Sequence, residues 1–164
     1  MNLMLGRPRT ISAHIIFALI VPAVAAEIDI YSNARYGYSV SYPRDLLRPL
    51  PEADNGDGRI FKAKTGAAEF RVFAEGNALD ESAELIAKRA ESDCPDRKAS
   101  YRVVKPTLVA VSCTMTNGHV YYQKTLIRGG METTMTANYP KPEGQIWARA
   151  VSVMSKTMTA ARPL

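Results

Sequence analysis

The sequence predicts an α+β protein in which one antiparallel β-sheet of about six strands is flanked by two main helices. Apolar and polar residues alternate with a period of two in several segments between residues 36 and 139. Two stretches, 79–90 and 143–159, instead repeat apolar residues with helical spacing. The pair Asn117-Gly118 lies between two alternating segments and is a strong hairpin signal. A sheet and helices that each have one apolar face bury those faces against one another.

The chain begins with a segment that has the layout of a secretory signal peptide. Arg7 and Arg9 make its start positive, and the stretch 13–21 is apolar apart from His14. Small residues follow at 23–26. This order of a basic, an apolar and a small-residue region is typical of a segment that is removed on export.

We expect cleavage before Glu27 or one residue earlier, so that residues 1–26 are the signal peptide and 27–164 form a single α+β domain. A retained membrane anchor is the alternative, although the apolar run 11–26 falls short of the ~20 residues that span a bilayer. After cleavage no stable membrane span is expected, and the protein is expected to be periplasmic or secreted. Residues 27–164 hold 19 Lys and Arg against 16 Asp and Glu, spread along the chain. This mild excess does not favour a nucleic-acid partner.

The first strands are predicted from alternation and from turn residues. In 36–42 apolar residues alternate with Gly and Ser, and Pro43 ends the strand. Pro49 and Pro51 predict an irregular stretch, which is followed by a polar loop. Two further strands are predicted at 59–65 and 68–74. The residues expected to face the core are Tyr38, Val40, Tyr42, Phe70, Val72 and Ala74.

The period then changes to that of a helix. Asp80 is the predicted N-cap, and Glu81 and Glu84 lie where the positive end of the helix dipole favours acidic residues. The apolar stripe consists of Leu79, Ala83, Ile86, Ala87 and Ala90. Because the stripe is rich in alanine, the helix can lie close to the sheet.

An antiparallel meander is predicted next, with strands at 101–105, 107–116, 119–127 and 131–139. Asn117-Gly118 joins the middle pair, and Gly129-Gly130 joins the last pair. One face of the second strand is expected to carry Val109, Val111, Cys113 and Met115.

The last predicted element is an amphipathic helix from about Glu143 to Thr159. Its apolar residues recur at helical spacing, which predicts that they face a core. They are Trp147, Ala150, Val151, Met154 and Met158.

The order of these elements, together with the segment Tyr-Gly-Tyr-Ser-Val-Ser-Tyr-Pro at 36–43, resembles the PsbP-like fold family. This fold is shared by an extrinsic photosystem II subunit, a nuclear-import factor and many exported bacterial proteins of unknown role. The resemblance implies a sandwich of sheet and helices, and docking or accessory roles more than enzymatic ones. It assigns no functional residue by position.

Cys94 and Cys113 are the two cysteines of the chain. In an oxidising compartment we expect them to form a disulfide that ties the end of the first helix to the sheet. Two free thiols are the alternative. A structural zinc site ordinarily takes four ligands, and residues 27–164 add only His119 to the two cysteines.

Three other groups of residues are candidate sites. His119 follows the Asn-Gly turn and is expected to be an exposed turn residue rather than a general base. Asp54, Asn55 and Asp57 depart from calcium-loop spacing and are expected to form a polar loop. Tyr121, Tyr122 and Tyr139 are either core and strand residues or an aromatic binding surface.

No catalytic, cofactor-binding or metal-binding residue is therefore assigned, and no cofactor is expected. The sequence favours an exported envelope protein that binds or docks onto an unidentified envelope protein or ligand without catalysis. The alternative is a small extracytoplasmic hydrolase that uses acidic residues in a cleft. A concave pocket with two converging carboxylates is the feature that would favour the hydrolase.

Overall fold

The computed structural model describes residues 27–163, so the predicted signal peptide at 1–26 lies outside the described residues. Among those residues nine strands form two sheets, one of two strands (β1-β2) and one of seven in the order β3-β4-β5-β9-β8-β7-β6. All pairings are antiparallel. The bounds are β1 Ile28–Ser32, β2 Ser39–Pro43, β3 Leu47–Glu52, β4 Gly58–Ala63, β5 Glu69–Gly76, β6 Tyr101–Lys105, β7 Leu108–Thr114, β8 His119–Arg128 and β9 Met131–Pro140.

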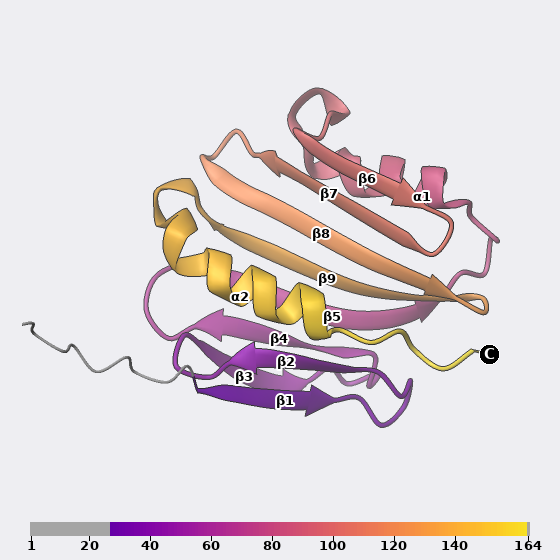
Figure 1. Cartoon of the computed structure of the whole chain (residues 1–164), viewed down its shortest axis with the longest axis horizontal. Coiled ribbons are helices and arrows are strands. Elements are labelled where there is room, and N and C mark those ends of the chain that lie inside the picture. Colours follow the sequence, from indigo (N-terminus) through magenta and orange to yellow (C-terminus); the bar gives the residue numbers. More distant parts are fainter. Residues whose placement is uncertain (1–26, 164) are drawn as a thin grey trace, which may run out of the picture.

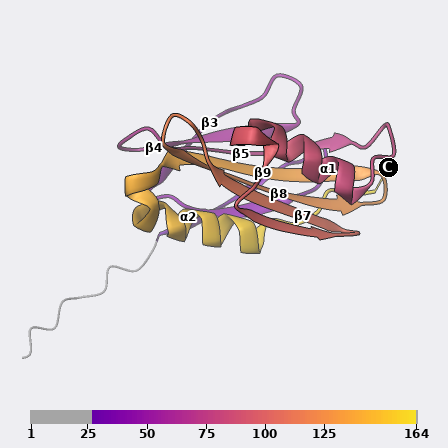
Figure 2. The same ribbon diagram turned by 90° about the horizontal axis from the view of Figure 1, so that it is seen from above.

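Two α-helices lie on opposite faces of the large sheet (Figure 2). Helix α1 (Ala83–Ala90) packs against β6 and β7, whereas α2 (Gly144–Thr157) packs against β2 and β9. The small sheet lies beside α2 on the same face (Figure 1). Three short 3₁₀ helices complete the elements: η1 Glu91–Asp93, η2 Pro95–Arg97 and η3 Lys141–Glu143. The predicted α+β architecture is confirmed.

The larger core lies between α2, the small sheet and strands β3, β4, β5 and β9. Trp147, Ala150 and Met154 point into it from α2, as the helical stripe predicts. The inward residues of β2 and β5, and Tyr38 just before β2, are also those predicted by alternation: Tyr38, Val40, Tyr42, Phe70, Val72 and Ala74. Successive side chains of a strand point to opposite faces, which is why a period of two identifies them.

A smaller core lies under α1 on the other face. Ile86, Ala87 and Ala90 pack there against Val109 and Val111 of β7. The structure contains a disulfide between Cys94, just after η1, and Cys113 of β7, with Cα atoms 5.8 Å apart. Cys113 shares the face of β7 that α1 covers, which is the side that alternation predicts for it.

The start of α1 differs from the prediction, which placed Leu79 in the apolar stripe and Asp80 at the N-cap. Ser82 is the N-cap, and its hydroxyl accepts a first-turn backbone N–H at 3.3 Å. The Asn77 side chain instead binds the backbone N–H and carbonyl of Glu81, at 2.8 and 2.9 Å, and holds this segment in a turn. Asp80 has a positive φ of 52°, and Leu79 is 83% exposed.

Two strands were not predicted, and the large sheet has seven strands rather than about six. Pro49 and Pro51, which predicted an irregular stretch, lie within β3. This strand is at the edge of the sheet, where a missing N–H need not break the ladder, and its register shifts between Pro49 and Glu52. In β1 the apolar side chains of Ile28 and Ile30 are exposed. This strand therefore lacks the alternation of buried apolar and exposed polar residues from which strands are predicted.

Each helix covers only part of the sheet face on which it lies. One half of each face of the large sheet is therefore left uncovered. On the α1 side the uncovered half consists of β3, β4, β5 and β9. On the α2 side it consists of β6, β7 and β8. Sites on this fold can therefore lie beside either helix.

Candidate functional site

The α1 groove, a depression of about 320 Å³, runs beside α1 on the uncovered half of the sheet. Its lining comes from β5, β8, β9 and the segment that contains α1 and η1, and is largely polar. Three polar residues of β8 and β9 on this side of the sheet are almost fully buried: Thr125, Glu132 and Thr134. Buried polar groups need hydrogen-bond partners. These residues therefore make the groove the first candidate for a catalytic or binding site.

Arg89 of α1 binds three carboxylates at one end of this groove. Its guanidinium lies 2.6 Å from Glu132 of β9, 3.1 Å from Glu81 and 3.3 Å from Glu75 of β5. Glu132 is only 3% exposed. Burial raises the pKa of Glu132, and the positive charge of Arg89 offsets part of that rise. The guanidinium therefore fastens α1 to two strands of the sheet.

A chain of hydrogen bonds crosses the floor of the groove. The Tyr121 hydroxyl donates to Gln123 Oε1 at 2.6 Å, and Gln123 Nε2 donates to Thr125 Oγ1 at 3.1 Å. The hydroxyls of Thr125 and Thr134 are 2.9 Å apart. Burial raises the pKa of Tyr121, and nearby Asp93 adds to this effect. These groups satisfy one another, and the hydroxyls stay protonated at neutral pH.

The groove does bring two carboxylates together, which is the feature on which the hydrolase hypothesis depends. However, Glu75 and Glu132 both lie against the guanidinium of Arg89. Acid–base hydrolysis needs one carboxylate to be free to give a proton and the other to face the reacting atom or a water. Arg89 pairs with both carboxylates, so neither is free for these roles, and the geometry does not favour hydrolysis.

The raised pKa of Glu132 predicts a pH-dependent stability. Glu132 binds its proton more tightly in the folded protein than in the unfolded chain. Below its usual pKa, Glu132 therefore makes its full contribution to the free energy of unfolding. That contribution is lost as pH rises through the raised pKa. We expect Arg89→Met to lower the free energy of unfolding by about 1–3 kcal/mol at neutral pH, where Glu132 loses its partner.

Urea denaturation of Arg89→Met at neutral pH and at about pH 4 tests this prediction. The loss should shrink at the lower pH, where Glu132 can take up a proton. Lys88→Met is the matched control, since Lys88 is the exposed neighbour of Arg89 in α1. An equal loss at both pH values would show that Glu132 does not depend on the guanidinium.

The other candidate residues from the sequence do not converge on one site. His119 is half-buried rather than exposed, and its Nδ1 lies 2.5 Å from Asn138 Oδ1. Asn55 Nδ2 donates to the carboxylate of Asp57 at 2.7 Å within the loop that precedes β4. Asp54 is exposed in the same loop. Within residues 27–163 no group of three or more His, Cys, Asp or Glu side chains could hold a metal ion.

The three tyrosines of the meander do not form one aromatic surface. Tyr121 lies in the small core under α1, whereas Tyr122 and Tyr139 pack against the larger core on the α2 side. Adjacent positions of a strand point to opposite faces, which separates Tyr121 from Tyr122. The core and strand interpretation therefore holds for Tyr121.

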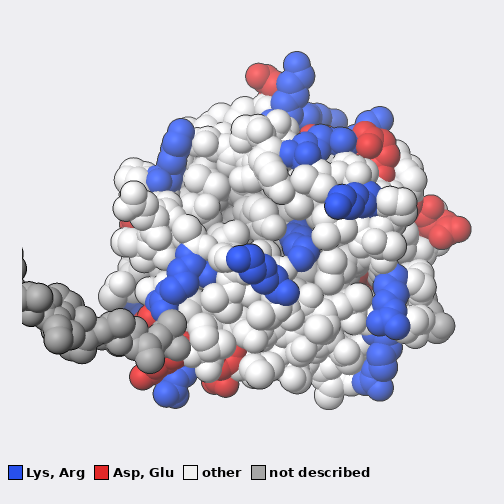
Figure 3. Space-filling model, viewed as in Figure 1, with Lys and Arg blue, Asp and Glu red and all other residues white. Residues whose placement is uncertain are grey.

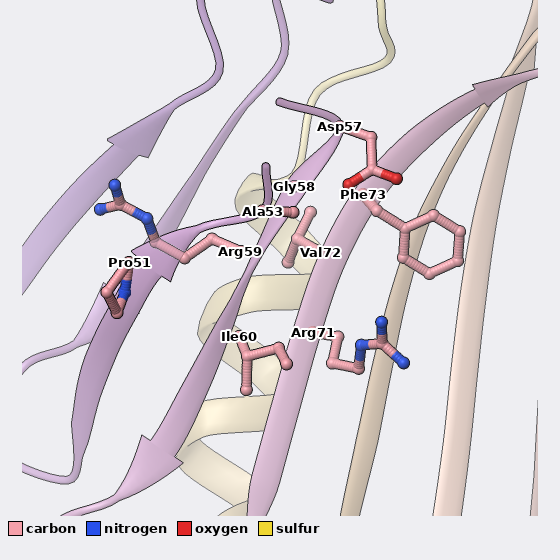
Figure 4. Close-up of a pocket in the computed structure, with 9 residues that line it drawn as sticks. All are labelled: Pro51, Ala53, Asp57, Gly58, Arg59, Ile60, Arg71, Val72 and Phe73. Carbon is pink, nitrogen blue, oxygen red and sulfur yellow. The ribbon is translucent and has the colours of Figure 1, made fainter. Parts of the chain in front are cut away.

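A second, smaller cavity of about 80 Å³ lies where β3, β4 and β5 meet (Figure 4). Arg59 and Arg71 line it from neighbouring strands but point in different directions (Figure 4). Their guanidinium carbons lie 4.8 Å from the ring of Tyr31 and 5.9 Å from the ring of Phe73. A cavity of this size holds a few water molecules, so it is not a site for an organic ligand.

Comparison with known proteins identifies the fold. No family model matches the chain, and no curated protein matches it in sequence. The solution structure of cyanobacterial PsbP (CyanoP) from Synechocystis sp. PCC 6803 is similar, with a TM-score of 0.59 and 10% sequence identity. The match covers 87% of this chain and 98% of that one. The chain therefore has a PsbP-like fold, as the element order and the strand at 36–43 predicted.

None of the helices within 27–163 is long and apolar enough to cross a bilayer.

Proposed function

We propose that this protein is an exported accessory domain of the cell envelope that docks onto a partner and does not catalyse a reaction. The observation that carries the proposal is the Arg89 cluster. Three carboxylates beside the α1 groove are engaged in holding α1 on the sheet, since Arg89 binds Glu75, Glu81 and Glu132 at once. Groups paired in this way stabilise a domain rather than transfer protons.

Three further observations support export and docking. The segment 1–26 has the order of regions found in signal peptides. A disulfide such as Cys94–Cys113 persists in oxidising compartments. The PsbP-like fold also supports an accessory role, because the family resemblance implies docking more than enzymatic functions.

N-terminal sequencing of the protein from the periplasmic or culture fraction tests export. The first residue is expected to be Glu27 or Ala26, because the small residues before them suit signal peptidase. Ile16→Asp with Leu19→Asp interrupts the apolar run and should leave the chain uncleaved inside the cell. A protein that keeps Met1 and sediments with membranes would instead identify a retained anchor.

Chemical crosslinking in intact cells tests docking. A tagged chain should yield one recurring envelope protein, and an excess of untagged chain should compete for it. Repeated failure to capture any partner would contradict the proposal. The hydrolase would instead be favoured if the protein turned over an envelope polymer and if Glu75→Gln and Glu132→Gln each abolished this activity without unfolding the protein.

A further inference from the structure

The uncovered half of the sheet on the α2 side forms a trough beside α2. Strand register places its floor residues in three cross-strand rows, since directly paired residues share a face. The rows are Tyr101-Ser112-Tyr122, Val103-Ala110-Lys124 and Lys105-Leu108-Leu126. Helix α2 forms one wall, where Lys124 Nζ donates to the carbonyl of Ser155.

The floor of the trough carries apolar side chains along its length. Tyr101 is 52% exposed at the edge of the sheet. Val103, Leu108, Tyr122 and Leu126 are each only partly buried. The surface is hollowed beside α2, over these strands (Figure 3). Aromatic and aliphatic groups in such a concave position can receive an apolar side chain from a partner.

Basic side chains lie toward the end of the trough away from Tyr101. Lys105 and Arg128 are exposed there, and Lys124 lies half-buried on the floor. None of the three forms an ion pair with another residue of 27–163. On the α1 side, by contrast, Arg102 binds Glu84 and Glu91. Basic side chains predominate over acidic ones on the α2 face (Figure 3).

We propose that the trough binds an acidic segment of the partner protein. An apolar side chain of that segment lies against Tyr101 and Tyr122, and its carboxylates pair with Lys105, Lys124 and Arg128. Lys105 lies four positions after Tyr101 in β6, so the two kinds of contact are about 13 Å apart. This inference rests on the proposed docking function and adds the surface and the chemistry of the partner.

The shape of the trough favours a polypeptide segment over an anionic membrane. Lys124 lies on the floor and is half-buried beside α2, so only a narrow chain that enters the hollow can reach it. A bilayer surface is broad and would meet only the cations at the rim. Steering by opposite charges also speeds association and sets orientation, which suits an accessory domain.

A photo-crosslinking phenylalanine analogue at Leu108, in intact cells, tests the proposal. We expect an adduct with one envelope protein, attached at a segment rich in Asp and Glu. The same analogue at Ile60, on the α1 side of β4, is the positional control and should give no such adduct. Ile60 is partly buried, as Leu108 is.

Charge reversal supplies the second measurement. Lys105→Glu with Arg128→Glu should reduce the Leu108 adduct at least tenfold, because the carboxylates of the segment then meet like charges. Lys62→Glu with Lys88→Glu makes the same change of charge on the α1 side and should leave the adduct unchanged. All four side chains are exposed, so each pair is expected to fold.

The possible outcomes separate this inference from the proposed function. Adducts at Ile60 but not at Leu108 would overturn the trough and leave docking intact. A captured segment without acidic residues would overturn the stated chemistry. The protein could instead float with phosphatidylglycerol vesicles, lose this binding in the Lys105/Arg128 reversal and give no protein adduct. That result would identify a membrane surface as the partner. Failure to crosslink from any position would contradict docking itself.

Discussion

Trp147→Ala is expected to lower the free energy of unfolding by about 3–5 kcal/mol, the range for deleting a large buried aromatic side chain. Trp147 is 2% exposed in α2, and its ring centroid lies 6.0 Å from that of Phe70 in β5. Its indole N–H donates to Glu143 at 2.8 Å. The substitution leaves a cavity between the helix and the sheet and removes the partner of a carboxylate. Both effects destabilise the same core.

Urea denaturation followed by circular dichroism is the appropriate measurement, because Trp147 is the chain's one tryptophan and its fluorescence is lost in the variant. Trp147→Phe keeps most of the buried area and should cost less. Ile146→Ala is the matched control, since Ile146 is the preceding residue and is 54% exposed. A Trp147→Ala midpoint no lower than that of Ile146→Ala would contradict the assignment of this residue to the core.

The elements that the sequence predicts best are those with a strictly local cause. Helix α2 was predicted over 143–159 and is found at 144–157, because its apolar stripe identifies one face of a helix. The hairpin at Asn117-Gly118 was placed correctly, since glycine adopts the positive φ of 79° that the turn requires. The edge strand at 101–105 has the predicted bounds.

Other elements depend on contacts that no local pattern contains. The proline-containing β3 is a strand because it pairs with β4 at the edge of the sheet. The cap of α1 is Ser82 rather than Asp80, because the Asn77 side chain holds Glu81 in a preceding turn in which Asp80 has a positive φ. Both residues have cap propensity, and only the tertiary arrangement of the preceding turn decides between them.

The candidate sites depend even more on tertiary structure. Arg89 meets Glu75 and Glu132 across 14 and 43 residues of sequence, so their spacing in the chain does not predict the cluster. The trough likewise depends on the pairing register of β6, β7 and β8. A sequence signal for it does exist. Between residues 97 and 162 there are ten Lys and Arg but only two Asp and Glu, an imbalance that the average over the chain conceals.

Breaking the disulfide is the second change with a large expected effect. Cys94→Ser and Cys113→Ser should each lower the free energy of unfolding by about 3 kcal/mol, the value that loop closure gives for a ring of this size. The two positions are 19 residues apart in sequence and are 5% and 3% exposed. Cys94→Ala and Cys113→Ala serve as controls for the cost of burying a hydroxyl.

The double variant separates a covalent link from two independent buried cysteines. If the bond is present, either single change removes it, so the double variant should cost little more than one of them. Independent buried thiols would give losses that add. Reduction of the wild-type protein should bring its midpoint close to those of the single variants, because both treatments free the end of η1 from β7. Two reactive thiols in the native, unreduced, exported protein would exclude the bond. A reduced protein as stable as the oxidised one would show that packing under α1, through Ile86, Ala87 and Val111, holds this region without it.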